Sequence, residues 1–314
     1  MKTPVSRIEA PSPQTVTFEA VMPATMAVLA EESGIKRASL DPMVSFVLSV
    51  LAGAFVAFGA IFATTVLAGA MTTSAADGTL ASSAVLPYGI GRLLAGLAFS
   101  VGIIAVIIAG AELFTGNNLI VMAWANGKVT TPALLFNWVL VFAGNCVGAV
   151  LTAGLMFLTT QYTFGGGAVG LVALSTANAK AGLPLLPAFT LGIMCNALVC
   201  LAVWMCYSAR TNVDRVLTAV PPVAAFAAAG FEHCIANAYF IPMGLFIKAG
   251  APDSFWKSVN RTPADFPDLT WNNLISNLVP VTAGNIVGGS VMVAAAYWFV
   301  YLRKRTNEPR PDGS

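Results

Sequence analysis

The feature that most restricts the fold of this chain is a series of long apolar segments that contain very few charged side chains. A helix that crosses a bilayer needs about 20 mostly apolar residues, and six segments reach that length. They are residues 43–69, 89–126 (interrupted), 132–160, 184–208, 214–248 (interrupted) and 274–302.

Composition points the same way. Hydrophobic residues make up 57% of the 314 residues and charged residues only 10%, whereas soluble domains carry about 25% charged residues. The sequence therefore predicts an all-α integral membrane protein with six transmembrane helices. Soluble enzymes and nucleic-acid-binding proteins are excluded, since the net charge of +2 is also too small for a polyanionic partner.

The number of spans and the basic residues predict how the chain lies in the membrane. Six spans place both termini on one side, and with the termini inside, 11 Lys and Arg residues lie inside and 5 outside. Cytoplasmic loops are enriched in Lys and Arg, so both termini are expected in the cytoplasm. We expect the longer loops, 70–88, 161–183 and 249–273, on the outer side.

Three regions are expected along the chain. Residues 1–42 form a cytoplasmic N-terminal segment, 43–303 a six-helix channel domain, and 304–314 a cytoplasmic tail. Within the first region, Pro23 to Glu32 is predicted to form a short amphipathic helix that stops at Gly34. That helix either lies on the cytoplasmic face or acts as a movable plug.

An internal repeat relates the two halves of the chain. Residues 109–117 (AGAELFTGN) and 229–237 (AGFEHCIAN) share the pattern A-G-x-E-x-x-x-x-N, and A-G-N-x-V-G recurs from Ala143 and Ala283. Each half contains three spans, so the second half must enter the membrane upside down. An inverted repeat with interrupted helices is typical of transport proteins, with the path at the repeat interface.

Two acidic residues, Glu112 and Glu232, lie at equivalent positions inside the interrupted spans. A charged group at the bilayer centre costs at least about 2.5–3.5 kcal/mol, so both should face protein or a water-filled cavity. We favour a structural role, in which the carboxylates accept hydrogen bonds from backbone N–H groups freed at the breaks. The alternative is direct contact with the solute.

The one histidine in the chain, His233, lies in the second break beside Glu232. Its side chain has an ordinary pKa close to neutrality, so it can donate a hydrogen bond to an anion or pass it a proton. Glu232 is expected to orient the imidazole or to favour its charged form. Thr115, in the first break, offers a hydroxyl group that either satisfies local backbone or faces His233 across a small polar site.

Apolar side chains flank both breaks. Phe99 and Phe226 either pack as core residues or close the pore on one side of the polar centre, and Leu113 and Phe114 either pack in the core or narrow it on the other. Desolvation of an ion is costly, so a neutral acid passes such rings more easily than its anion. Two routes stay open: a weak acid takes a proton at His233 and crosses neutral, or the anion crosses dehydrated.

No feature indicates a metal, a cofactor or an enzyme. The five cysteines lie in apolar stretches without metal-ligand spacing. The chain also lacks CxxCH, histidine pairs for haem and nucleotide-binding loops. A facilitator of neutral solutes remains an alternative to an anion channel, although a neutral pore needs no titratable centre.

Five stretches in order resemble the formate/nitrite transporter family, and its formate-channel branch in particular. They are AGAELFTGN (109–117), NWVLVFAGNCVGA (137–149), LGIMCNALVCLAVWM (191–205), GFEHCIANAYFIPMG (230–244) and NLVPVTAGNIVGG (277–289). The resemblance runs from about Met22 to Arg303. It implies an aquaporin-like fold with broken second and fifth helices, in the inner (plasma) membrane, assembled as a homopentamer with one pore per protomer.

The resemblance also implies a cargo and residue roles. The cargo is formate, with nitrite or hydrosulfide as the main alternatives and acetate or lactate as further anions, accompanied by protons. The segment 252–274 is similar to the formate-channel version. The implied site comprises a pore centre (His233, Thr115, Glu232, Asn196, Asn237), a periplasmic constriction (Phe99, Phe226), a cytoplasmic constriction (Ile103, Leu113, Phe114), a further pore-lining residue (Val199) and a basic residue at the anion entrance (Lys180).

Overall fold

In the computed structural model of the protein, the described residues are 19–71, 73–74, 80–81 and 86–303. The predicted tail, 304–314, and the start of the N-terminal segment, 1–18, lie outside them. Helices dominate the described residues, and the β structure among them is one antiparallel pair of two-residue strands. In that pair, β1 (Thr73–Ser74) joins β2 (Leu80–Ala81) with Thr73 opposite Ala81.

Two similar series of helices follow each other along the chain. The first comprises α1 (Pro23–Ala38), α2 (Pro42–Met71), α3 (Tyr88–Ala109), α4 (Phe114–Asn117), η1 (Asn118–Ile120), α5 (Val121–Ala125) and α6 (Thr131–Leu158). The second comprises η2 (Gln161–Thr163), α7 (Ala168–Ala181), α8 (Leu185–Cys206), α9 (Asn212–Ala229), α10 (Cys234–Gly250), α11 (Asp253–Ser258), η3 (Pro263–Asp265), α12 (Trp271–Ile286) and the π-helical segments η4 (Val287–Ala295) and η5 (Trp298–Leu302).

The spans confirm the fold class. Within the described residues, five helices are long and apolar enough to cross a membrane, and α9 and α10, bent by 50° at their junction, make a sixth. The ends of the spans lie within a few residues of those predicted from sequence. The protein is therefore a multi-pass, all-helical membrane protein.

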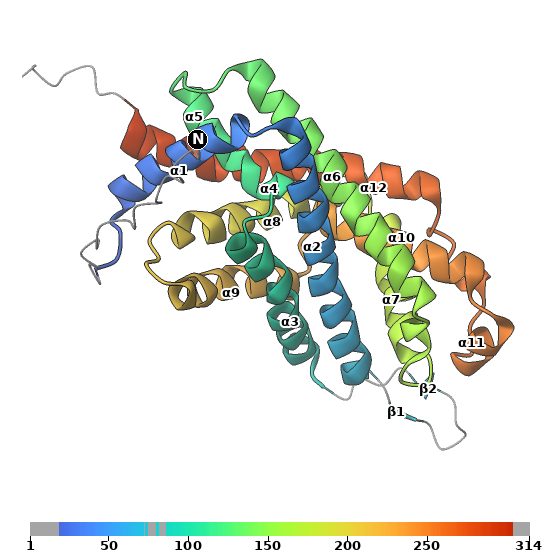
Figure 1. The fold of residues 1–314 in the computed structure, drawn as a ribbon. Helices are drawn as coiled ribbons and strands as arrows, with labels where there is room; N and C mark the ends of the chain where they lie inside the picture. Colours follow the sequence, from blue (N-terminus) through green and yellow to red (C-terminus); the bar gives the residue numbers. More distant parts are fainter. Residues whose placement is uncertain (1–18, 72, 75–79, 82–85, 304–314) are drawn as a thin grey trace, which may run out of the picture.

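The two halves pack around the breaks in the same way. Helix α3 lies beside α9, and the pairs α2–α6 and α8–α12 cross closely (Figure 1). Glycines permit these crossings, because a Cβ on Gly148 would lie 2.0 Å from the Val50 carbonyl oxygen and one on Gly288 would lie 2.1 Å from that of Ile193. Small residues let helix backbones approach in membranes, so the repeated A-G-N-x-V-G motif has a packing role.

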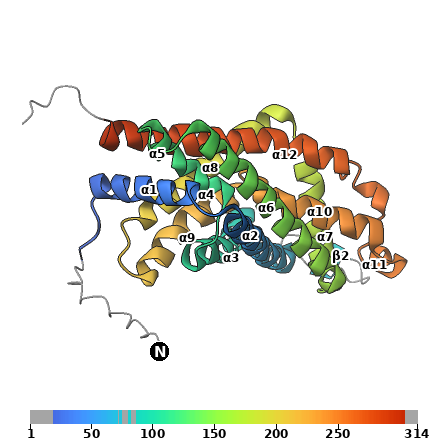
Figure 2. The ribbon, with the colours of Figure 1, turned by 45° about the horizontal axis from the view of Figure 1, so that its top comes forward.

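Helix α1 is longer than predicted. It continues past Gly34 to Ala38, so the predicted stop at Gly34 is wrong. Gly34 instead packs closely on the first broken span, since its Cβ would lie 3.3 Å from both the Ile120 Cα and the Ala123 Cβ. In both views α1 lies beside α5, at the far end of the molecule from α11 (Figures 1 and 2).

Helices also occupy two segments expected as long loops. Residues 161–183 contain α7, and residues 249–273 contain α11 and η3. Helix α7 precedes α8 as α1 precedes α2, and it packs against α10 as α1 packs against η1 and α5. We therefore identify α1 and α7 as equivalent members of the repeat, so each half has one more helix than its spans.

Candidate functional site

Both interrupted spans break at a glycine in the left-handed conformation. Helix α3 ends at Gly110 (φ 74°) and α9 ends at Gly230 (φ 78°), a region that glycine adopts easily because it has no Cβ. The next helices begin after Leu113 and His233, which both have φ −110°. The two breaks therefore have the same local geometry, as the repeat predicts.

Asn145 on α6 satisfies backbone groups that the first break leaves free. Its Oδ1 accepts a hydrogen bond from the Phe114 N–H (2.9 Å), and its Nδ2 donates to the carbonyl oxygens of Glu112 (2.9 Å) and Ser49 (2.7 Å). Backbone polar groups cannot be left without partners inside a bilayer. The Asn145 side chain thus stabilises the first break through three hydrogen bonds to backbone groups.

Asn285 on α12 does the same for the second break. It accepts from the Cys234 N–H (3.0 Å) and donates to the carbonyl oxygens of Glu232 (2.9 Å) and Gly192 (2.8 Å). The repeat motif reveals this residue in the sequence but gives no reason for it. The structural reason is the stabilisation of a broken helix.

The buried carboxylate of Glu232 has a cation and an amide as partners. Lys180 Nζ lies 2.7 Å from Oε1, and Asn237 Nδ2 donates to Oε2 at 2.6 Å and also to Asn277 Oδ1 at 2.8 Å. Asn237 Oδ1 is buried and has no hydrogen-bond partner among the described residues. Glu232 is therefore paired, but the network around it contains no donor for Asn237 Oδ1.

Glu112 lies in the equivalent network of the first half. Asn117 Nδ2 donates to Glu112 Oε2 (2.7 Å) and to Asn137 Oδ1 (3.0 Å), and Arg37 Nε lies 3.8 Å from Glu112 Oε1. The Arg37 guanidinium also donates to Asn117 Oδ1. Arg37 at the end of α1 is thus the counterpart of Lys180 at the end of α7, and its planar fork supplies the donor that the second network lacks.

These networks correct two expectations about the acids. The carboxylates do not accept hydrogen bonds from the N–H groups of Phe114 and Cys234, because these donate to Asn145 and Asn285. Among the described residues, the side-chain partners of the Glu232 carboxylate are Lys180 and Asn237, so it does not orient His233. Both carboxylates are thus held by side-chain partners, and a structural role for the two acids stays a prediction.

His233 and Thr115 face each other between the breaks. His233 Nε2 lies 3.2 Å from Thr115 Oγ1, and His233 Nδ1 accepts a hydrogen bond from the Ala236 N–H at 3.1 Å. Because Nδ1 acts as an acceptor, this geometry fits the neutral tautomer with its proton on Nε2. Both side chains are buried, so the sequence-predicted pair is brought together in the interior.

Two phenyl rings lie next to His233. The Phe226 ring stacks near the imidazole with centroids 6.0 Å apart, and Phe99 meets Phe226 edge-to-face at 5.7 Å. A cavity of about 1080 Å³ leads to these three side chains from the exposed side chain of Tyr88. Phe99, Phe226 and His233 therefore all line this wide cavity, with the two phenyl rings beside the imidazole. Whether these rings form the expected constriction stays a prediction.

The residues expected on the other side of the centre are buried in the core. Ile103 is 1% exposed, and Leu113 and Phe114 are each 2% exposed. The Phe114 ring packs edge-to-face on Phe142 (5.2 Å) and Trp138 (6.3 Å) of α6. These contacts hold the ring on α6, immediately before Thr115.

Asn196 on α8 links the two breaks. Its Nδ2 lies within hydrogen-bonding distance of the Thr115 carbonyl (3.3 Å), Asn118 Oδ1 (2.8 Å) and the Asn285 carbonyl (2.7 Å). Val199, three residues further along α8, is fully buried. Asn196 thus has an evident structural function in addition to the pore-facing position predicted for it.

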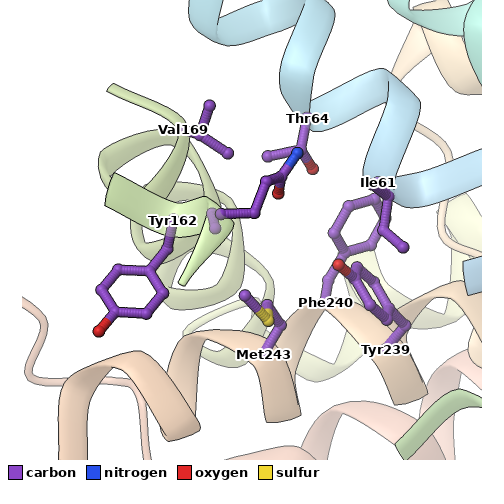
Figure 3. A pocket seen from close by; sticks show the side chains of 9 residues that line it. Ile61, Thr64, Tyr162, Val169, Tyr239, Phe240 and Met243 are labelled. Atoms are coloured by element: carbon purple, nitrogen blue, oxygen red, sulfur yellow. The ribbon is translucent and has the colours of Figure 1, made fainter. Parts of the chain in front are cut away.

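Lys180 lines the same large cavity, together with Glu232, but its side chain is only 16% exposed and its ammonium group is paired with the Glu232 carboxylate. A second, water-sized cavity of about 10 Å³ lies between α2, α7 and α10 (Figure 3). Thr64, Tyr239 and apolar side chains such as Met243 line it. It is too small for a solute larger than a water molecule.

Sequence reasoning misses the roles of two basic residues. In the sequence, Arg37 contributes only to the charge count, and Arg92 only to the charge on one side of the membrane. In the structure, Arg92 on α3 donates from Nε to the Ala228 carbonyl (3.0 Å) and from Nη2 to the Ala227 carbonyl (2.6 Å), which caps the end of α9. A basic residue near the start of an apolar span is the signal that could have drawn attention to Arg92.

Cysteine chemistry is not prominent in this site. Cys195, Cys200 and Cys234 are buried near the breaks as free thiols, and Cys200 Sγ donates to the Thr115 carbonyl at 3.1 Å. Within the described ranges, no group of three His, Cys, Asp or Glu residues is placed to hold a metal ion.

Comparisons with known proteins bear on this geometry. The sequence pattern of the formate/nitrite transporter family matches residues 24–299. "Formate channel FocA" of Escherichia coli K12 is 42% identical over 288 residues, which cover 91% of this chain and 96% of the relative. "Formate channel FocA" of Haemophilus influenzae is 37% identical over 281 residues, covering 89% and 94%.

Solved structures agree in fold. "Pentameric formate channel with formate bound" is 43% identical with a TM-score of 0.75 and covers 83% of this chain and 98% of its own. "FNT family ion channel" is 27% identical with a TM-score of 0.68, covering 88% and 98%. All four are named as channels, which confirms that this chain is not an enzyme. With the fold, the paired breaks and these matches in agreement, the chain belongs to the formate/nitrite transporter family.

Proposed function

We propose that this protein is a channel for formate and similar small monovalent anions, with His233 and Thr115 at the centre of its passage. The observation that carries the proposal is the 3.2 Å contact between His233 Nε2 and Thr115 Oγ1, enclosed between the two breaks. The names of the relatives, formate channels in two organisms, support formate as the cargo.

In this proposal an arriving anion replaces Thr115 as the acceptor of the His233 Nε2–H. Phe99 and Phe226 form the constriction on the cavity side, while Ile103, Leu113 and Phe114 form the one beyond it. Asn196 and Val199 complete the wall. The core burial of these apolar side chains supports a dry passage, in which only a small solute held by the polar centre crosses.

We also propose that transport is coupled to protons, which requires a change in the hydrogen bonds of His233. The neutral imidazole offers a hydrogen bond through Nε2, but it becomes a proton donor only after Nδ1 has also taken up a proton. That protonation removes the lone pair that accepts the Ala236 N–H, so the N-cap bond of α10 must open. Conduction of the anion and transfer of a proton are therefore separable functions of His233.

The proposal extends to assembly and location. The solved relative "Pentameric formate channel with formate bound" is a pentamer, and we propose a homopentamer of this chain in the inner (plasma) membrane with cytoplasmic termini. Residues 43–303 form the channel domain, and the α1 segment before it belongs to the inverted repeat. Lys180 acts at the anion entrance through its ion pair with Glu232 rather than as a free charge.

A liposome flux assay tests the cargo. Formate, nitrite, hydrosulfide and glycerol are compared with and without a pH gradient, with empty liposomes as the control. We expect formate to cross fastest and an inward proton gradient to accelerate it. Faster nitrite or hydrosulfide would assign the channel to those anions, and passage of glycerol without formate would refute an anion channel.

A further inference from the structure

The large cavity above Phe99 and Phe226 has a size and a lining that its small cargo does not require. Its volume is about 1080 Å³, just above the range of about 300–1,000 Å³ for small-molecule sites. Its wall is mainly apolar and includes the aromatic side chains of Tyr88, Phe231 and Phe240 as well as the Phe99–Phe226 pair.

Some of the charged side chains that line this cavity have no oppositely charged partner among the described residues. Lys180 and Glu232 neutralise each other at 2.7 Å. Asp265 is engaged by Thr262 at the exposed rim, where its Oδ2 accepts a backbone hydrogen bond at 2.7 Å. Two guanidinium groups, Arg92 and Arg261, line the cavity without a carboxylate within salt-bridge distance among the described residues.

Arg92 is the better placed of the two. Its side chain is half-buried, and its Nε and Nη2 donate to two carbonyl oxygens at the end of α9. These bonds fix the guanidinium in position and leave further N–H groups of its five without a hydrogen-bond partner in the described part of the chain. A fixed cation at an apolar wall binds a carboxylate in a directed, charge-assisted manner.

We propose that this cavity is a binding site for aromatic monocarboxylates, with the carboxylate on Arg92 and the ring against the phenyl side chains below it. Arg261 assists at the rim. Phe99 and Phe226 pack edge-to-face at 5.7 Å beside His233 in the wall of this cavity, and in this proposal the pair leaves too little space for an aromatic ring to pass, so such an acid binds but does not cross. The consequence, a block of formate flux, depends on the proposed function, whereas the binding itself does not.

Isothermal titration of the full-length channel in detergent with sodium benzoate measures the binding directly. We expect Arg92→Gln to weaken benzoate at least about tenfold, a factor equivalent to about 1.4 kcal/mol, and Arg92→Lys to weaken it less, because the ammonium group keeps the charge but loses the fixed guanidinium fork. Arg215→Gln, the same charge change at the other end of α9, is the matched control and should stay within about twofold. Benzyl alcohol, which has the ring without the charge, should bind to the wild type and to every variant far more weakly than benzoate binds to the wild type.

Equal affinity of benzoate for the wild type and Arg92→Gln would overturn the site. Should Arg92→Gln fail to fold because it loses the α9 cap, Arg261→Gln decides, since it leaves that cap intact. It should weaken benzoate about threefold, and an unchanged affinity would count against the site.

A flux measurement separates this inference from the proposed function. External benzoate should inhibit formate uptake into liposomes while labelled benzoate stays outside. Uptake of benzoate through the channel would show that the Phe99–Phe226 pair lets an aromatic ring pass. Formate flux without benzoate binding refutes the inference alone, and benzoate binding without formate flux refutes the proposed function alone.

Discussion

Replacement of Asn285 by alanine tests whether asparagine side chains stabilise the two helix breaks. Asn285→Ala removes one acceptor and two donated bonds, to Cys234, Glu232 and Gly192. At the average of about 0.6 kcal/mol for such bonds in a membrane protein, the loss is about 2 kcal/mol. Backbone groups left buried without partners cost about 1–3 kcal/mol each and raise the figure toward 5 kcal/mol.

The measurement is the free energy of unfolding of the purified channel, from a denaturant titration followed by circular dichroism. Asn145→Ala is the internal comparison, because it loses the equivalent three bonds and should lower stability by a similar amount. Asn273→Ala, which loses one exposed bond on the surface, is the control and should change stability by at most about 0.5 kcal/mol. A loss below about 0.5 kcal/mol in Asn285→Ala would show that this side chain does not stabilise the second break.

Three further predictions concern the passage and its network. His233→Asn should keep anion conduction but lose the acceleration by a proton gradient, because an amide does not titrate; an unchanged pH response of flux would rule out the protonation role. Phe226→Ala should raise formate flux several-fold and admit larger anions, since the aromatic pair with Phe99 is lost; flux at the wild-type level would contradict the constriction. Lys180→Arg should raise the melting temperature, because a guanidinium group can bond both to Glu232 and to Asn237 Oδ1, which has no partner among the described residues, and add about 1 kcal/mol. A lower melting temperature would show that position 180 is not equivalent to Arg37.

The parts of the fold that can be predicted from the sequence are those that a linear pattern records. Hydrophobic length predicts the spans, and the repeated glycines and asparagines predict the inverted halves and both breaks. His233 and Thr115 are paired in the prediction because they lie at corresponding breaks, and the structure brings them to 3.2 Å.

The parts that sequence reasoning misses depend on contacts between distant segments. Helix α7 is not evident in the sequence because its small residues give no clear apolar face. The partners of Glu232 could not be deduced, because Lys180 lies 52 residues away and outside the repeated motif. The role of Arg92 is hidden for the same reason: its hydrogen bonds reach α9, about 136 residues along the chain.

An experimental structure of the channel with formate bound tests most directly whether His233 and Thr115 form the centre of the passage. We expect density for the anion between Thr115 and His233, with one carboxylate oxygen within hydrogen-bonding distance of His233 Nε2 and the direct contact of the two side chains broken. Formate bound elsewhere, with the contact between His233 and Thr115 intact and no continuous passage beside it, would exclude this pair as the centre.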